Sequence, residues 1–385
     1  MRAKTSLLLA LAVTCGGCGV GSCRSNPPAG ANQAAPATVP KRLLYLIAPD
    51  GSYAALDRDT LASVATGDLK DAQIYQIDGI VPDPQRQAIV LRTSRAWSAT
   101  ATEPSVGLVI VRMVREGGTP RLRLVREVPP PAVPRQFKGA MVAGGPSHLV
   151  LASWAGPDGM TTSLATNSAN EPPRQAKDFA LGPANCTSAD GARAYALQPG
   201  RPLQIGILTV NDLSVKRGPT GLSAAASSPI FIAGASGACR ALLVGRPDKP
   251  TQQRVQLPAV LYDLESQRSV QEMTVSAPSD FFLSADGSTL LADEKTLVAN
   301  VLPSGATVGM KYRKTGVLRI YGTSAAKEIA TARLAQDGTV SLILEPLAYY
   351  VSPKLLSVVN LTTGAVTATA AIPFTRAFVA PLDEQ

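Results

Sequence analysis

The strongest constraint on the fold is a β-hairpin signal that recurs along the chain. Within residues 281–291 an apolar run stops at Asp286-Gly287 and then resumes. A two-residue turn between right-twisted strands needs positive φ, which Gly adopts freely and Asp tolerates, so this pattern predicts a tight hairpin. The same Ser-Ala-Asp-Gly core recurs within 185–195, and a Ser-Gly version recurs within 231–243. The recurrence predicts a repeat fold.

A second hairpin signal follows the first kind. An apolar strand ends in Asp or Asn, a short Ser/Thr turn follows, and another strand begins, as in 210–214, 260–266 and 358–364. Two successive hairpins make a four-stranded antiparallel meander. The chain contains 32 Gly and 31 Pro and has almost no stretch with apolar residues at helical spacing, so we expect an all-β fold.

These units repeat about every 50 residues, which is typical of propeller blades. The first unit holds three strands, and the last piece of chain, 374–382, is a lone strand. Pairing these two pieces in one blade would remove two open sheet edges. We therefore predict one domain, a seven-bladed β-propeller of four-stranded antiparallel blades, closed by the C-terminal strand. The predicted units are 42–69, 79–128, 137–181, 184–222, 229–275, 280–334 and 338–373.

Residues 1–23 resemble the signal of a bacterial lipoprotein. A positively charged start precedes the apolar run 7–13, which is too short to span a bilayer as a mature helix. Three cysteines follow, and Cys23 fits the motif best, because aliphatic Val20 lies three positions before it with small residues between. We predict lipidation of Cys23. Cys15 and Cys18 are the other candidates, and an ordinary cleaved secretory signal is the alternative.

Residues 24–41 are rich in Pro, Ala and small polar residues without a period, which predicts a flexible linker. The propeller domain is then 42–385. We expect an exported protein, held by its lipid anchor in the bacterial envelope and facing the periplasm or the cell surface.

Two motifs resemble those of the seven-bladed YVTN, or YncE-like, periplasmic propellers. Residues 284–291, Ser-Ala-Asp-Gly-Ser-Thr-Leu-Leu, are similar to that family's proline-aspartate-glycine hairpin. Residues 360–366, Asn-Leu-Thr-Thr-Gly-Ala-Val, are similar to its strand-aspartate-threonine-glycine turn. The family's tyrosine-valine-x-asparagine signature is degenerate, with Ala292-Asp293 where it would end. The resemblance implies the fold, and it transfers no functional residue.

Catalytic and metal-binding motifs are scarce. His148 is the single histidine, which excludes a multi-histidine metal centre and leaves one residue for any Ser-His-Asp arrangement. A lone histidine beside a turn is more often solvated or hydrogen bonded. Carboxylates that could hold calcium or act as acid and base also fit ordinary turn chemistry; they are Asp57, Asp59, Asp71, Asp286 and Asp293. We expect no cofactor and no metal.

The formal net charge of +9 suggests anionic partners. The densest cluster lies within 112–126, where Arg121 and Arg123 alternate with leucines and share one strand face. That basic face could meet lipid headgroups, lipopolysaccharide or nucleic acid. It could equally be an outer edge strand that is charged to deter pairing. Few aromatic residues accompany the cluster, so nucleic acid is an unlikely partner.

Four irregular stretches are long for hairpin connections, namely 93–106, 156–173, 245–257 and 295–316. Such loops are usually functional or disordered. Arg, Trp and Tyr anchor many interfaces, and the alternative is that these are solvated connections. The candidate partner-binding residues are Trp97, Trp154, Lys311, Tyr312, Arg313 and Lys314.

The two cysteines beyond the signal, Cys186 and Cys239, lie at the same turn level of the fourth and fifth predicted units. Neighbouring inner strands converge near the ring axis, so a Cα separation of about 5.5 Å is plausible. The envelope is an oxidising compartment. We predict a disulfide between them, with two buried free thiols as the alternative.

Two functional hypotheses follow. The first is a non-catalytic envelope propeller that acts as a binding scaffold for a protein or glycan partner. The alternative is a propeller-type enzyme or redox-enzyme subunit, such as a lactonase-like hydrolase or the heavy subunit of a quinoprotein. We favour the first, because the sequence shows no catalytic constellation.

Overall fold

The computed structural model describes residues 40–69, 74, 76–95, 97, 105–131, 136–143, 149–157, 159–165, 171–198, 203–222, 229, 231–235, 237–245, 255–301, 303 and 307–384. The chain divides into two units, residues 1–39 and 40–385, and the second is the folded body. The predictions for Cys15, Cys18, Cys23, Asp71 and His148 lie outside the described residues.

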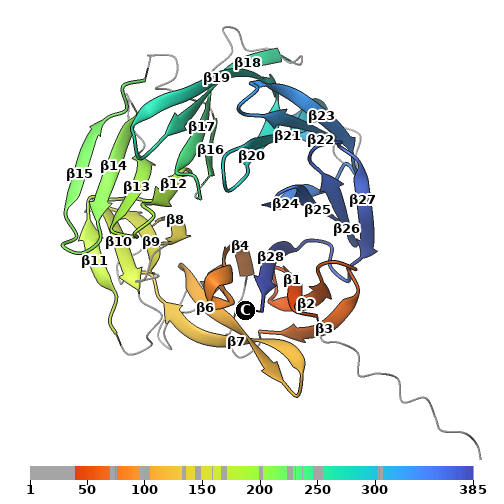
Figure 1. Ribbon diagram of the computed structural model, residues 1–385, viewed down its shortest axis with the longest axis horizontal. Coiled ribbons are helices and arrows are strands. Elements are labelled where there is room, and N and C mark those ends of the chain that lie inside the picture. The colour runs from red at the N-terminus through yellow and green to blue at the C-terminus, as the bar shows by residue number, and fades with distance from the viewer. Residues whose placement is uncertain are drawn as a thin grey trace, which may run out of the picture. The chain divides into compact units, whose positions relative to one another are not determined.

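Seven four-stranded antiparallel sheets form a ring, as Figure 1 shows. The prediction of a seven-bladed β-propeller is therefore confirmed. No helix in the described part of the chain has the length and hydrophobicity needed to cross a membrane.

The blades are given from the innermost strand outward. Blade one is β28 (Phe378–Asp383), β1 (Arg42–Ile47), β2 (Ser52–Asp57) and β3 (Ser63–Asp68). Blade two is β4 (Gln76–Asp83), β5 (Ala88–Arg95), β6 (Ser105–Glu116) and β7 (Thr119–Val128), with the 3-10 turn η2 (Pro84–Arg86) after β4. Blade three is β8 (Gln136–Val142), β9 (Val150–Gly156), β10 (Gly159–Ala165) and β11 (Arg174–Lys177). Blade four is β12 (Asn185–Thr187), β13 (Arg193–Gln198), β14 (Gln204–Thr209) and β15 (Val215–Pro219).

The remaining blades follow the same order. Blade five is β16 (Phe231–Ala235), β17 (Arg240–Val244), β18 (Val255–Asp263) and β19 (Arg268–Ala277). Blade six is β20 (Ser279–Leu283), β21 (Thr289–Val301), β22 (Thr307–Gly322) and β23 (Lys327–Arg333). Blade seven is β24 (Thr339–Leu344), β25 (Leu347–Ser352), β26 (Leu355–Asn360) and β27 (Val366–Ala371).

The C-terminal strand closes the ring, as predicted. Strand β28 pairs antiparallel with β1, with Leu382 opposite Leu43 and Ala380 opposite Tyr45. All four side chains are fully buried and pack in a core cluster that reaches blade two. Blade one therefore takes its strands from both ends of the domain, and β28 covers the inner edge of β1, which would otherwise lack a partner strand.

The recurring Ser-Ala-Asp-Gly turn is longer than the predicted two-residue turn. In blade six Ser284 N–H donates to Thr289 O at 2.9 Å, so the connection spans residues 285–288. Asp286 Oδ1 accepts Ser288 N–H at 3.0 Å, and Gly287 adopts φ +70°. Blade four repeats these contacts in 188–193. The aspartates of these turns therefore bind backbone of their own hairpins.

Tyrosine hydroxyls join neighbouring blades. Tyr262 of blade five donates to Thr220 O, beyond the last strand of blade four, at 2.8 Å. The hydroxyl of Tyr321 in blade six accepts Ser276 N–H of blade five at 3.2 Å. Burial raises the pKa of Tyr262 to about 12, which favours the protonated hydroxyl that donates this hydrogen bond.

Two of the predicted irregular stretches contain strands of the blades. The stretch 156–173 contains β10, the third strand of blade three. The stretch 295–316 is mostly the distal half of the β21–β22 hairpin. The prediction of a long loop is therefore wrong for 295–316, and in 156–173 it is wrong for residues 159–165, which are strand.

Candidate partner-binding surface

The most prominent feature of the surface is a hairpin that outgrows its own blade. Strand β20 pairs with β21 only as far as Glu294, and β23 pairs with β22 only from Val317 onward. Beyond these points β21 and β22 pair with each other alone, out to Val301 and Thr307. We call residues 295–301 and 307–316 the arm. Within the described residues, neither edge of the arm is covered by another strand.

The arm carries the most exposed large hydrophobic side chains among the described residues. Tyr312 is 60% exposed, Val308 54% and Met310 52%. These three residues alternate along β22, so they point to one face of the hairpin. Alternation of this kind normally places apolar side chains against a core, and here nothing in the described part of the chain covers them. Exposed apolar patches of this type mark interaction sites.

A groove with a volume of about 1320 Å³ lies beside the arm. The arm lines one side through residues 311–314, and the β23–β24 connection lines another through 336–338. Pro353, from the β25–β26 turn, and residues 375–378, which lead into β28, complete the walls. Connections between second and third strands and those between blades emerge on the same face of an antiparallel ring, so the groove lies on one face of blades six, seven and one.

The groove carries an excess of unpaired positive charge. Lys311, Arg313 and Arg376 line it and are exposed. In the described part of the chain these three cations have no ion-pair partner. Asp337, on the wall formed by the β23–β24 connection, is an exposed carboxylate. The surface of the groove is therefore suited to an anionic partner.

Lys314 has a different role from its neighbours on the arm. Its Nζ lies 2.5 Å from Asp293 Oδ2 and 3.8 Å from Asp280 Oδ2. The Asp293 side chain is 1% exposed, and its Oδ1 has no hydrogen-bond partner among the described residues. Burial raises the pKa of Asp293, and the hydrogen bond from Lys314 opposes that rise. Lys314 thus stabilises the base of the arm, and its role in partner binding stays a prediction.

The prediction that Trp154 contacts a partner is wrong, because its side chain is fully buried. It lies on β9 and packs edge-on against Phe137, with ring centroids 5.8 Å apart. Its indole N–H donates to Val106 O of blade two at 3.0 Å. Trp154 therefore joins blades two and three.

Trp97 is half-buried and makes its contacts within its own blade. Its N–H donates to Ser105 O at 2.7 Å. The guanidinium of Arg95 lies 4.8 Å from the ring centroid. These contacts hold Trp97 against blade two, and a role in partner binding stays a prediction.

Arg121 and Arg123 lie on β7, the outermost strand of blade two. Arg121 Nη1 donates to Thr66 O of blade one at 2.6 Å. Arg123 forms an ion pair with Glu116 at 2.7 Å. Since both arginines have local partners, these contacts favour the outer edge-strand interpretation over an open basic face.

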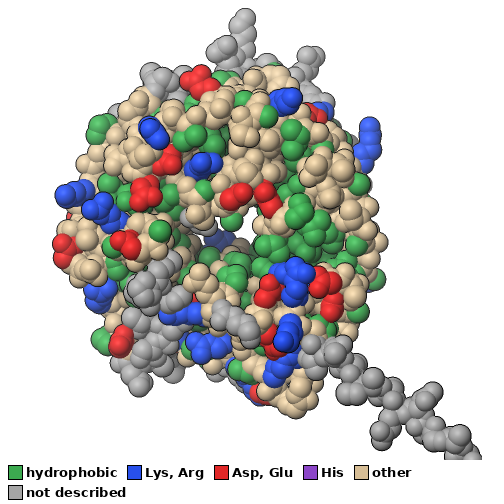
Figure 2. Space-filling view, viewed as in Figure 1, with side chains coloured by type: hydrophobic (Ala, Val, Ile, Leu, Met, Phe, Trp, Pro, Cys, Tyr) green, Lys and Arg blue, Asp and Glu red, His purple; other side chains and the backbone are tan. Residues whose placement is uncertain are grey.

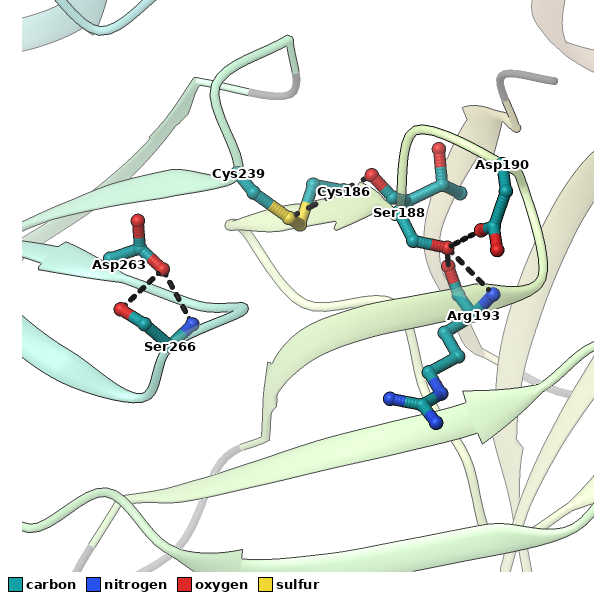
Figure 3. The surroundings of a disulfide bond; sticks show 8 residues. Cys186, Ser188, Asp190, Arg193, Cys239, Asp263 and Ser266 are labelled. Atoms are coloured by element: carbon teal, nitrogen blue, oxygen red, sulfur yellow. Dashed lines mark hydrogen bonds between the residues drawn. A yellow bond between two sulfur atoms is a disulfide. The ribbon is translucent and has the colours of Figure 1, made fainter.

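Cys186 and Cys239 are joined in a disulfide, shown in Figure 3. Their Cα atoms lie 5.1 Å apart, and both residues are buried between blades four and five. The Ser188–Asp190 turn and the Asp263–Ser266 turn lie nearby. The pair is thus part of the structural interface between two blades.

Figure 2 shows an opening at the ring centre, with hydrophobic side chains beside it. Most of the side chains that line it on the inner strands of blades five to seven are apolar. Ile232, Phe282 and Ile343 contribute to that wall, and the cavity there is about 430 Å³.

No group of three or more His, Cys, Asp or Glu side chains that could hold a metal occurs among the described residues. Asp57 serves its own turn, since its Oδ1 accepts Thr60 N–H at 2.7 Å, and this bond lowers its pKa.

Comparison with known proteins supports the fold. No family model and no curated protein sequence matches the chain. Apo AztD from Citrobacter koseri is similar in structure, with 9% identity, a TM-score of 0.55, and coverage of 89% of this chain and 98% of AztD. The dihydro-heme d1 dehydrogenase NirN, in complex with DHE, has 13% identity, a TM-score of 0.50, and coverage of 88% of this chain and 74% of NirN. At these identities the likeness shows a shared β-propeller fold.

Val308, Met310 and Arg376 were missed in the sequence interpretation. A signal for the first two was present, because Val308, Met310 and Tyr312 alternate with polar or small residues over 307–313. That period of two is typical of a strand. Arg376 has no comparable signal, since only ring closure brings it to the groove.

Proposed function

We propose that this protein is an exported, lipid-anchored envelope propeller that works by binding a partner at the groove beside the arm. The observation that carries the proposal is the arm itself, a hairpin with uncovered edges and an exposed apolar face. The arm presents the exposed apolar side chains Val308, Met310 and Tyr312 on one face. It carries the exposed cations Lys311 and Arg313 beside the groove, where Arg376 adds a third positive charge. Apolar and charged side chains that lie close together in this way are typical of interfaces.

The rest of the ring supports a scaffold role for the blades. Inter-blade contacts such as those of Trp154 and Tyr262 are buried and hydrogen bonded, so the ring is held together independently of the arm. A rigid ring can carry a specialised surface element without changing its own core. The envelope location rests on the N-terminal signal and stays part of the proposal.

The test is capture of partners from native envelope extracts with the purified ring as bait. The variant Lys311→Glu/Arg313→Glu reverses two exposed charges of the arm and keeps the ion pair between Lys314 and Asp293. The matched control, Lys327→Glu/Arg333→Glu, makes the same charge change on exposed positions of β23 in the same blade. We expect the arm variant to lose capture while the control retains it, with both rings folded.

Equal capture by the two variants would contradict the proposal. Turnover of a small-molecule substrate by the ring, unaffected by either variant, would favour the enzyme alternative.

A further inference from the structure

The outer edge of the arm offers backbone groups that another strand could use. Strand β22 is 16 residues long, and β23 covers it only from Val317 onward. Within the described residues, no strand lies on that side of 307–316. A long exposed strand edge is a template for pairing with another chain. Peptides that add a strand to such an edge gain affinity from main-chain hydrogen bonds and specificity from alternate side chains.

The apolar and the positively charged side chains of this part of β22 lie on opposite faces of the hairpin. Val308, Met310 and Tyr312 lie on one face of the hairpin, and Lys311 and Arg313 lie on the other. An added strand would place its own side chains on these two faces in alternation. A complementary strand would therefore alternate apolar residues with acidic ones.

Charge argues against a second copy of this chain as the added strand. Antiparallel pairing of two arms would bring Lys311 and Arg313 of one copy beside those of the other. Like charges on neighbouring strands are destabilising. Arg376, which lines the same groove, adds to the positive charge that an acidic partner would meet.

We propose that the free edge of β22 binds an extended acidic segment of an envelope protein by strand addition. The inference rests on the proposed function and deepens it by naming the partner chemistry. Apolar side chains of the segment pack on Val308, Met310 and Tyr312. Its carboxylates pair with Lys311, Arg313 and Arg376, and its backbone continues the arm as a third strand.

The probe is a fluorescent nine-residue peptide in which glutamate alternates with valine or leucine. We expect saturable binding to the purified ring, measured by fluorescence anisotropy. The variant Lys311→Glu/Arg313→Glu should lower its affinity about tenfold or more, whereas Lys327→Glu/Arg333→Glu should leave it unchanged. A peptide with lysine in place of glutamate should not bind.

Backbone methylation separates strand addition from simple charge attraction. Two peptides carry N-methyl groups at alternate residues, one in each register, so that each blocks one edge of the added strand. One of the two should lose binding and the other should retain it. Equal binding of both methylated peptides and the unmethylated peptide would overturn the inference. Full displacement of the peptide by an acidic polysaccharide, together with peptide binding that is insensitive to methylation, would also overturn it.

Failure of the inference is distinguishable from failure of the proposed function. If the peptide does not bind while capture from envelope extracts still depends on Lys311 and Arg313, strand addition is wrong and partner binding at the arm stands.

Discussion

Replacing Lys314 by methionine should destabilise the ring, because it leaves a buried carboxylate without its partner. The Asp293 side chain is 1% exposed, and its second oxygen has no hydrogen bond within the described part of the chain. Removing one member of a buried ion pair typically costs about 3–5 kcal/mol. For a domain of this size that corresponds to a fall in Tm of about 4–7 °C. Methionine preserves most of the side-chain volume, so the loss reports the charge.

The pH dependence of this loss follows from the pKa of Asp293. Burial raises that pKa, and the hydrogen bond from Lys314 counteracts the rise. Without the lysine, the folded pKa should rise further above the unfolded value. A raised pKa favours the folded state at low pH, and this contribution is lost as pH increases through the folded pKa. The loss of stability caused by Lys314→Met should therefore become smaller as the pH is lowered.

Thermal unfolding of wild type and variant at several pH values measures both effects. Lys311→Met is the matched control, because Lys311 lies on the same strand, is exposed and has no ion-pair partner among the described residues. It should change stability by less than about 0.5 kcal/mol. The double variant Lys314→Met/Asp293→Asn should recover much of the loss. A deficit no larger than that of the control, or one that grows on acidification, would refute the reasoning.

Other predictions concern closure, inter-blade contacts and the anchor. Truncation after Pro373 removes β28 and should abolish cooperative unfolding of the ring, whereas removal of Gln385 alone should have no effect on the melting curve. Serine at Cys186 and Cys239, 53 residues apart, should lower stability by about 4 kcal/mol; two reactive thiols in the unfolded, unreduced wild-type protein would contradict the disulfide. Tyr262→Phe removes one buried hydrogen bond and should cost about 1 kcal/mol in chemical denaturation; an unchanged midpoint would argue against the inter-blade role. Mass spectrometry of membrane-extracted protein should find acyl mass on Cys23, and an unmodified N-terminus downstream of it would exclude lipidation.

The blades were predictable from the sequence because their signals are local. Each hairpin combines a period of two with turn residues that suit its geometry, as in 284–289, where Asp286 binds the backbone of its own turn. Ring closure was predictable because the first unit lacks one strand and the last piece of chain is a single strand, so pairing the two completes one blade.

The candidate site was less predictable because it depends on contacts between distant elements. Trp154 looks from the sequence like a loop anchor beside a turn, and only the packing of two blades shows that it is buried. Lys314 and Asp293 are 21 residues apart, and a bulge in the β21–β22 pairing sets their contact. The groove itself combines connections from blades six, seven and one, which no single segment encodes.

The central claim, that the arm is the partner-binding surface, is tested most directly by site-specific photocrosslinking in the native envelope. A photoreactive residue replaces Tyr312 on the arm or, as control, Ile329, an exposed hydrophobic residue on β23 of the same blade. The account predicts a discrete crosslinked protein from position 312, absent with Lys311→Glu/Arg313→Glu, and none from position 329. Crosslinking from position 329 but not from 312 would contradict it.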